Sequence, residues 1–159
     1  SETTSRTLGA HAGATYALGE HTTLAAAGSV ASLTGEEKTM AEAVETAIKA
    51  ARRWGVEVKN IPNGRQEILC AQGNFHGRTL AAVSMSTDPE SYGNYGPYVP
   101  GFVKVPFGDA MAMEAAVTDH TVAILVEPIQ GEAGVVVPPE GFMRGLAAFL
   151  REESFPCAS

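Results

Sequence analysis

The sequence predicts an α/β fold, with a mostly parallel sheet flanked by helices. Three short apolar segments have the length of strands, and each is followed by a segment with apolar residues at helical spacing. One of the three, TVAILV (121–126), is a continuous apolar run, which is typical of a strand buried on both faces of a parallel sheet. Strands that alternate with helices along a chain favour layered α/β architecture.

The longest predicted helix lies in AEAVETAIKAARRWG (41–55). Thr39 and Glu42, three residues apart, form a plausible capping box at its start, and Gly55 is a natural C-terminal stop. One helical stripe carries the apolar residues Val44, Ala47, Ile48, Ala51 and Trp54. We therefore expect this helix to pack against the sheet through that stripe.

The remaining elements follow in order. We expect strands in EILCAQ (67–72) and FVKVPF (102–107), and helices in LAAVSMS (80–86), DAMAMEAAVTD (109–119) and EGFMRGLAAFLREE (140–153). The segment 86–102 contains too many turn-forming residues to be regular throughout. Residues 1–33 show no convincing period and stay unassigned, which leaves 34–153 as the predicted domain and 154–159 as a tail.

The charge and amino-acid composition of the chain argue against some classes of binding partner. Eleven Lys and Arg residues against 18 Asp and Glu residues give a net charge of −7, which argues against nucleic acid or an anionic membrane as a partner. No apolar run approaches the roughly 20 residues that cross a bilayer. Two distant cysteines suit a reducing compartment, so we expect a cytoplasmic protein. The spacing of His11, His21 and His120 predicts no metal site.

Two loops that follow predicted strands carry polar residues suited to binding. Ligands of open parallel sheets collect beyond the carboxyl ends of the strands. An aromatic face covers a planar ring, a guanidinium grips a carboxylate and a helix N-terminus, here near Ala41, attracts phosphate. The first loop carries Asn74, Phe75, His76 and Arg78, and the second carries Glu127, Gln130 and Glu132.

These residues also have purely structural alternatives. Composition alone is compatible with Phe75 in the core, Arg78 in a surface ion pair and Glu127 capping a turn. His76 is equally compatible with an ordinary loop histidine. The sequence has no GxSxG, GxGxxG or P-loop motif, so hydride transfer and nucleotide hydrolysis have no support.

Several longer motifs carry a family resemblance over residues 41–150. They are AEAVETAIKAARRWG, GNFHGRTLAAVSMSTDP, YGPYVPGF, VPFGD and VEPIQGEAGVVVPPEGF, in this order. With them the chain resembles the class III pyridoxal-phosphate-dependent aminotransferases, and within that family the ornithine aminotransferase group. The resemblance implies part of the large domain of a fold-type I transferase, in which two subunits of a homodimer share each active site.

The implied reaction moves the δ-amino group of ornithine to 2-oxoglutarate, giving glutamate semialdehyde and glutamate, with pyridoxal phosphate as cofactor. The resemblance implies that Phe75 stacks on the cofactor ring, with His76 beside it and Glu127 close by. It also implies that Arg78 binds a substrate carboxylate and that Glu132 pairs with a second arginine from the C-terminal part of the family's chain. Relatives acting on acetylornithine or 4-aminobutyrate share this scaffold.

The chain departs from the family before the long helix. Family members read close to MNTGAEAVETA where this chain has EKTMAEAVETA, so Lys38 replaces Asn and Met40 replaces Gly. Thr39 is retained, and the resemblance implies that it contacts the cofactor. Met40 is expected to crowd the backbone amides that approach the phosphate.

None of the lysines in the chain sits in the family's Schiff-base lysine motif, and the family's cofactor aspartate is also not found. The lysines are Lys38, Lys49, Lys59 and Lys104. The chain is therefore expected to be an incomplete member of the family. We expect it to contain no catalytic residue and to catalyse no turnover on its own. The alternative is a catalytically dead α/β fragment that acts only as an associating or small-molecule-binding module.

Overall fold

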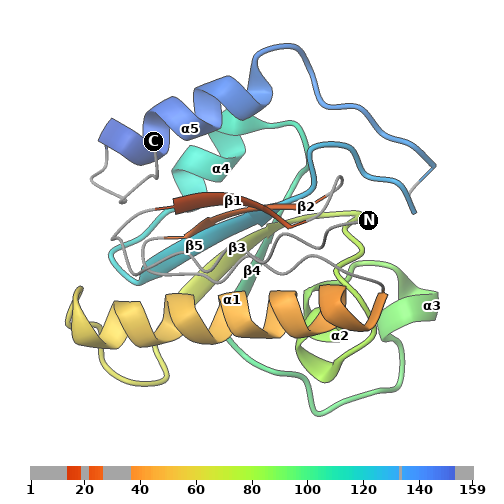
Figure 1. Cartoon of the computed structure of the whole chain (residues 1–159), viewed down its shortest axis with the longest axis horizontal. Coiled ribbons are helices and arrows are strands. Elements are labelled where there is room, and N and C mark those ends of the chain that lie inside the picture. Colours follow the sequence, from red (N-terminus) through yellow and green to blue (C-terminus); the bar gives the residue numbers. More distant parts are fainter. Residues whose placement is uncertain (1–13, 19–21, 27–36, 133, 153–159) are drawn as a thin grey trace, which may run out of the picture.

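The computed structural model describes residues 14–18, 22–26, 37–132 and 134–152 (Figure 1). The strands are β1 (Ala14–Leu18), β2 (Thr22–Ala26), β3 (Glu67–Ala71), β4 (Phe102–Val105) and β5 (Thr121–Val126). The helices are α1 (Glu37–Glu57), α2 (Leu80–Met85), α3 (Pro89–Tyr92), α4 (Ala110–Ala116) and α5 (Phe142–Glu152). In this part of the chain, no helix is both long and apolar enough to cross a membrane.

The strands form one sheet in the order β1-β2-β5-β3-β4. Strand β3 runs parallel to both β4 and β5, which confirms the predicted parallel α/β core. Strands β1 and β2 add an antiparallel hairpin beside β5, and both lie in the segment that the sequence left unassigned. The hairpin was not predicted because its residues, ATYAL and TTLAA, mix small apolar and polar types without a clear alternation.

Helices cover both faces of the sheet. Figure 1 shows α1 and α2 on one side of the sheet and α4 and α5 on the other. Ile68 and Cys70 of β3 are buried in the cluster with α1 and α2, whereas Leu69 and Ala71 are buried in the cluster with α4 and α5. This two-sided burial explains why the strands read as unbroken apolar runs.

Helix α1 differs from its predicted bounds at both ends. It begins at Glu37, so Thr39 lies inside the first turn, and the predicted capping box at Thr39 is wrong. It ends at Glu57, so Gly55 lies within the helix and is not its stop. A Cβ on Gly55 would lie 2.4 Å from Cγ1 of Val122, so the glycine allows the helix to approach β5 closely.

The predicted stripe of α1 is confirmed. Its first four members, Val44, Ala47, Ile48 and Ala51, are buried, and Trp54 is half-buried. The shorter helices start where side chains cap them: Thr79 accepts a hydrogen bond from the Ala82 backbone N–H at the start of α2. Asp88 does the same for α3, a helix of four residues inside the turn-rich segment.

Candidate functional site

Two loops leave the sheet at the same edge, because β3 and β5 are parallel, hydrogen-bonded neighbours. The loop after β3 carries Phe75, and the loop after β5 begins with Glu127. Oε2 of Glu127 accepts a hydrogen bond of 3.2 Å from the backbone N–H of Phe75. The sequence predicted that both loops lie at this edge of the sheet, and this hydrogen bond joins them.

The loop after β3 is held by one buried amide. Nδ2 of Asn74 donates to the backbone oxygen of Ala71 at 2.6 Å and to that of Met85 at 2.9 Å. The first bond fastens the loop to the end of β3, and the second fastens it to the end of α2. Gly73 has a φ of 74° and Gly77 a φ of 113°, values that side-chain-bearing residues rarely adopt. The sharp turns on either side of Phe75 and His76 therefore require glycine.

The loop after β5 folds back on itself. Nε2 of the buried Gln130 donates to the backbone oxygen of Gln72 at 2.7 Å, which ties this loop to the end of β3 as well. The backbone groups of Gln130 and Val136 exchange two hydrogen bonds of 3.0 and 2.9 Å. Glu132 lies between them and is exposed.

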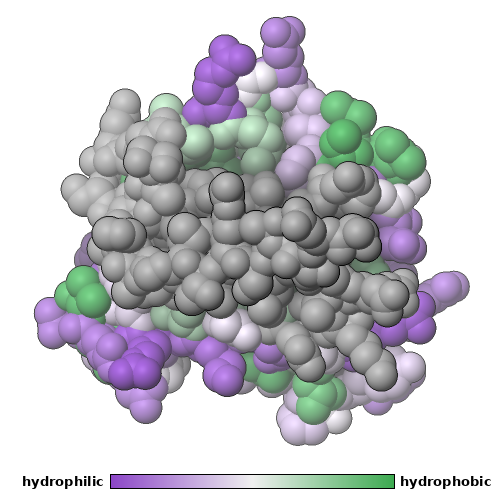
Figure 2. Space-filling model, viewed as in Figure 1, coloured by the Kyte–Doolittle hydropathy of each residue, from purple (hydrophilic) through white to green (hydrophobic). Residues whose placement is uncertain are grey.

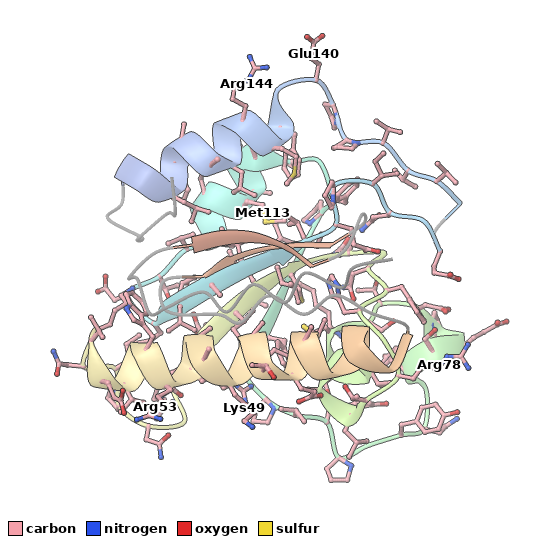
Figure 3. The ribbon with its side chains drawn as sticks, in the orientation of Figure 1. Lys49, Arg53, Arg78, Met113, Glu140 and Arg144 are labelled. Carbon is pink, nitrogen blue, oxygen red and sulfur yellow. The ribbon has the colours of Figure 1, made fainter. Side chains whose placement is uncertain are left out.

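A cavity of about 430 Å³ lies beside the loop after β3. Its apolar wall includes Leu80 and Val83 of α2. Figure 3 shows Arg78 on the side of the molecule that carries α2 and α3. The polar and aromatic residues that line it include Phe75, His76, Arg78, Asp88, Glu90 and Tyr95. Three of the predicted site residues thus share one cavity, whereas Glu127 and Glu132 are not among its lining residues.

His76 is the least satisfied polar side chain of this cavity. It is 4% exposed, and neither ring nitrogen has a hydrogen-bond partner. Burial lowers the pKa of His76 to about 4, so the imidazole is neutral at pH 7. A neutral imidazole offers one donor and one acceptor, and neither is used among the described residues.

Glu127 is also buried, at 4% exposed. Burial raises the pKa of Glu127 to about 7, the hydrogen bond from Phe75 opposes this rise, and the charge of Glu132 adds to it. The two predicted acidic residues are thus linked by this electrostatic influence. Glu127 therefore changes charge near neutral pH while it holds the Phe75 backbone.

One predicted site residue lies on another element, and two residues that line the cavity were not predicted. Thr39 is in the first turn of α1, but its side chain lies outside the described residues. Sequence reasoning did not single out Asp88 and Glu90, which line the cavity from the start of α3. The Asp-Pro-Glu sequence is a recognisable helix start and was the available signal for them.

Comparison with known proteins finds similar sequences over most of the chain. The family model described as Aminotransferase class-III matches residues 11–155. The chain is 58% identical over 128 residues to the ornithine aminotransferase of Bordetella pertussis and 51% identical over 130 residues to that of Oceanobacillus iheyensis. These alignments cover 77% and 79% of this chain but 31% and 33% of the relatives, so the chain spans about a third of their length.

Solved structures of aminotransferases are similar to this chain in both fold and sequence. The ornithine aminotransferase of Toxoplasma gondii superposes with a TM-score of 0.70 at 42% identity, over 72% of this chain and 27% of that one. A second crystal structure of that enzyme has pyridoxal phosphate at partial occupancy in its active site. The acetylornithine aminotransferase of Elizabethkingia anophelis gives a TM-score of 0.53 at 44% identity, over 70% of this chain and 27% of that one. Because the family model matches nearly the whole chain, this protein belongs to the class-III aminotransferases.

Proposed function

We propose that this chain forms one wall of the active site of an aminotransferase that moves the δ-amino group of ornithine to 2-oxoglutarate with pyridoxal phosphate. The observation that carries the proposal is the shared cavity of Phe75, His76 and Arg78, tied to β5 through Glu127. The names of relatives that are 51–58% identical support ornithine as the substrate. Residues 34–153 then belong to the cofactor-binding large domain, and the intact protein is a homodimer.

The residues present fit the ring end of this cofactor. Phe75 is half-buried at the cavity, which leaves part of its ring for stacking on a flat ligand. His76 lies in the same cavity wall, and its two buried ring nitrogens have no partner among the described residues. Glu127 fixes the backbone of Phe75 and thereby the position of the stacking ring. When bound, pyridoxal phosphate supplies a conjugated ring that withdraws electrons from the carbon bearing the amino group.

Arg78 suits the substrate carboxylate. Its side chain is exposed at the cavity, and no described carboxylate lies within ion-pairing distance of its guanidinium. A planar guanidinium binds a carboxylate through two parallel hydrogen bonds. The proposal places the phosphate near the first turn of α1, which contains Thr39, where free backbone N–H groups attract anions.

We expect the 159-residue chain to bind cofactor without turnover. Among the described residues, no lysine lines the cavity. Nζ of Lys59 donates to the backbone oxygen of Thr121, and Nζ of Lys104 donates to that of Ser86. An amine that holds the cofactor and then moves the proton is therefore not provided at this cavity by the described residues.

Titration with pyridoxal phosphate tests the proposal. We expect calorimetry to detect binding to the chain and Phe75→Leu to weaken it about tenfold, because the stacking face is lost. Phe107→Leu is the matched control, since Phe107 is also half-buried but packs against α5 on the opposite face. Absence of binding, or equal loss in both variants, would reject the proposal. Formation of glutamate semialdehyde from ornithine and 2-oxoglutarate would show that the expectation of no turnover is wrong.

A second candidate function is a non-catalytic associating module. It is favoured by apolar side chains in the loop between β5 and α5, where Val135 is 69% exposed and Val137 65% exposed. Figure 2 shows hydrophobic atoms gathered at the upper right, where Figure 1 draws this loop. Size-exclusion chromatography with light scattering decides: a monomer that unfolds cooperatively rejects association, and a stable oligomer supports it.

A further inference from the structure

A second, smaller cavity lies beside the C-terminal part of α1. Its volume is about 200 Å³, and its walls come from α1, from the turn between α1 and β3, and from Pro100 just before β4. Arg52 and Arg53 both line it, and none of its lining residues carries a carboxylate. It shares no lining residue with the cavity beside Phe75, and Figure 3 shows Arg53 far along α1 from Arg78. The two cavities are therefore separate sites.

Arg52 is fixed in the wall of this cavity. Its Nη2 donates a hydrogen bond to the backbone oxygen of Pro100, and the centre of its guanidinium lies 5.3 Å from the centroid of the Phe102 ring. Because a guanidinium has five N–H groups, these contacts leave donors for another acceptor. Burial lowers the pKa of Arg52, and the charge of Glu45 opposes this fall. The guanidinium is thus a positioned and partly desolvated cation, which binds an anion more strongly than a freely hydrated one does.

Arg53 presents a second guanidinium, whose outer nitrogens are unused. Its Nε donates to Oε1 of Glu57 at 2.8 Å, one turn further along α1. Its Nη1 and Nη2 have no hydrogen-bond partner among the described residues. An exposed ion pair of this kind contributes less than about 1 kcal/mol, so it competes weakly with a bound anion.

Gln66 gives an independent sign of an absent ligand. This residue lines the cavity and is 5% exposed, and its Oε1 accepts a hydrogen bond of 2.9 Å from the backbone N–H of Gly64. Its Nε2 has no partner among the described residues, and it is not one of their fully enclosed unpartnered atoms, which belong to Trp54, Asn74 and His76. The nitrogen therefore reaches the cavity with both N–H groups free. Buried amides rarely leave their donors unused, so an acceptor in the cavity is expected.

We propose that this cavity is a binding site for a small oxyanion, a single carboxylate or phosphate group, held by the guanidinium groups of Arg52 and Arg53 and by the amide N–H groups of Gln66. Both kinds of oxyanion accept paired hydrogen bonds from a guanidinium. The volume lies below the range of about 300–1,000 Å³ that is typical of sites for whole drug-sized molecules, so the site suits one anionic group. It is independent of the proposed aminotransferase chemistry.

The test titrates the 159-residue chain with inorganic phosphate and, separately, with acetate, at an ionic strength held constant with chloride. Proton–nitrogen NMR spectra report on the Gln66 side-chain N–H groups and on the Gly64 backbone N–H. We expect both signals to shift and to saturate. Saturation at a lower concentration of phosphate than of acetate would identify a phosphate group as the preferred ligand, and the reverse order would identify a carboxylate.

Variants on the cavity wall should weaken the anion. Arg53→Gln, at an exposed position, should raise the Kd about tenfold because a charged donor pair is lost. Gln66→Glu keeps an acceptor for Gly64 but replaces the free N–H groups with a negative charge, so saturation of the Gly64 signal should disappear. Glu57→Gln should instead lower the Kd about threefold, because it frees Nε of Arg53 and removes a competing carboxylate.

Matched controls remove the same charges outside the cavity. Arg65→Gln, at an exposed arginine that does not line it, and Glu114→Gln, at an exposed residue of α4, should leave the Kd within about twofold. If the Gln66 signals do not saturate, water fills the cavity and the inference is overturned. It is also overturned if Arg65→Gln weakens the anion as much as Arg53→Gln, or if Glu57→Gln and Glu114→Gln act alike, since the anion then follows overall charge.

Discussion

The loops after β3 and β5 leave the same edge of the sheet but differ in how far they remain fixed to it. The β3 loop is held at Asn74 by two hydrogen bonds and at Phe75 by the hydrogen bond to Glu127. The β5 loop is fixed at Glu127 and Gln130 and then projects, so that Glu132 and the valines after it are exposed. The difference indicates that the β3 loop sets the shape of the cavity, while the tip of the β5 loop contributes a charge from outside.

Asn74→Ala should have the largest effect, because it removes the amide that fastens the β3 loop to the end of β3 and to the end of α2. The backbone oxygens of Ala71 and Met85 lose a donor in a buried place, and we expect the free energy of unfolding to fall by about 3 kcal/mol. Urea denaturation measures the change. Asn63→Ala, at an exposed asparagine, should stay within about 0.5 kcal/mol. Equal changes in the two variants would mean that the β3 loop is not held by this amide.

The pH dependence of stability probes the connection between the loops. Glu127 has a pKa of about 7 in the folded chain against an ordinary value of 4.5, so the folded state binds more protons between these values. Its contribution is therefore fully present below pH 4.5 and is lost as pH rises through about 7. Since one unit of pKa corresponds to about 1.4 kcal/mol, we expect a loss of about 1–3 kcal/mol.

Glu127→Gln isolates that contribution, since the amide oxygen still accepts from Phe75 but does not titrate. The difference in free energy of unfolding between wild type and variant, measured by urea titration at several pH values, should shift against wild type as pH rises. Glu140→Gln, at an exposed site, should follow the wild-type curve. A constant difference between wild type and Glu127→Gln would show that Glu127 has no raised pKa.

Val137→Ser should have the smallest effect. Val137 is 65% exposed in the projecting part of the β5 loop, so we expect the free energy of unfolding to change by less than about 0.5 kcal/mol. The same change at Val126, which is 2% exposed at the end of β5, should cost about 3 kcal/mol because it places a hydroxyl in the core. Thermal unfolding of both variants gives the comparison. A large loss for Val137→Ser would mean that the tip of the β5 loop is packed.

Sequence reasoning predicted the parts of this fold that depend on local pattern. The three parallel strands and the stripe of α1 were predicted, because continuous and periodic apolar residues reflect burial directly. The position of Phe75, His76 and Arg78 beyond a strand end was also predicted, since parallel strands bring such loops to one edge.

The parts that failed depend on contacts between distant segments. Gly55 looks like a helix stop in sequence, and only the approach of α1 to Val122 reveals its role. The acidic side of the cavity was missed because Asp88 and Glu90 belong to a helix start, a local role that hides their proximity to Arg78. Whether a buried imidazole such as His76 has a partner is likewise a property of three-dimensional surroundings.

The reciprocal backbone hydrogen bonds between Gln130 and Val136 make residues 131–135 a unit with fixed ends. Such a unit can be exchanged as a cassette, since lengthening a loop whose ends are already joined adds little to the entropy of closing it. Segments of different length or charge from related proteins can therefore be transplanted at this point, and their influence on stability and on ligand affinity compared on an unchanged scaffold.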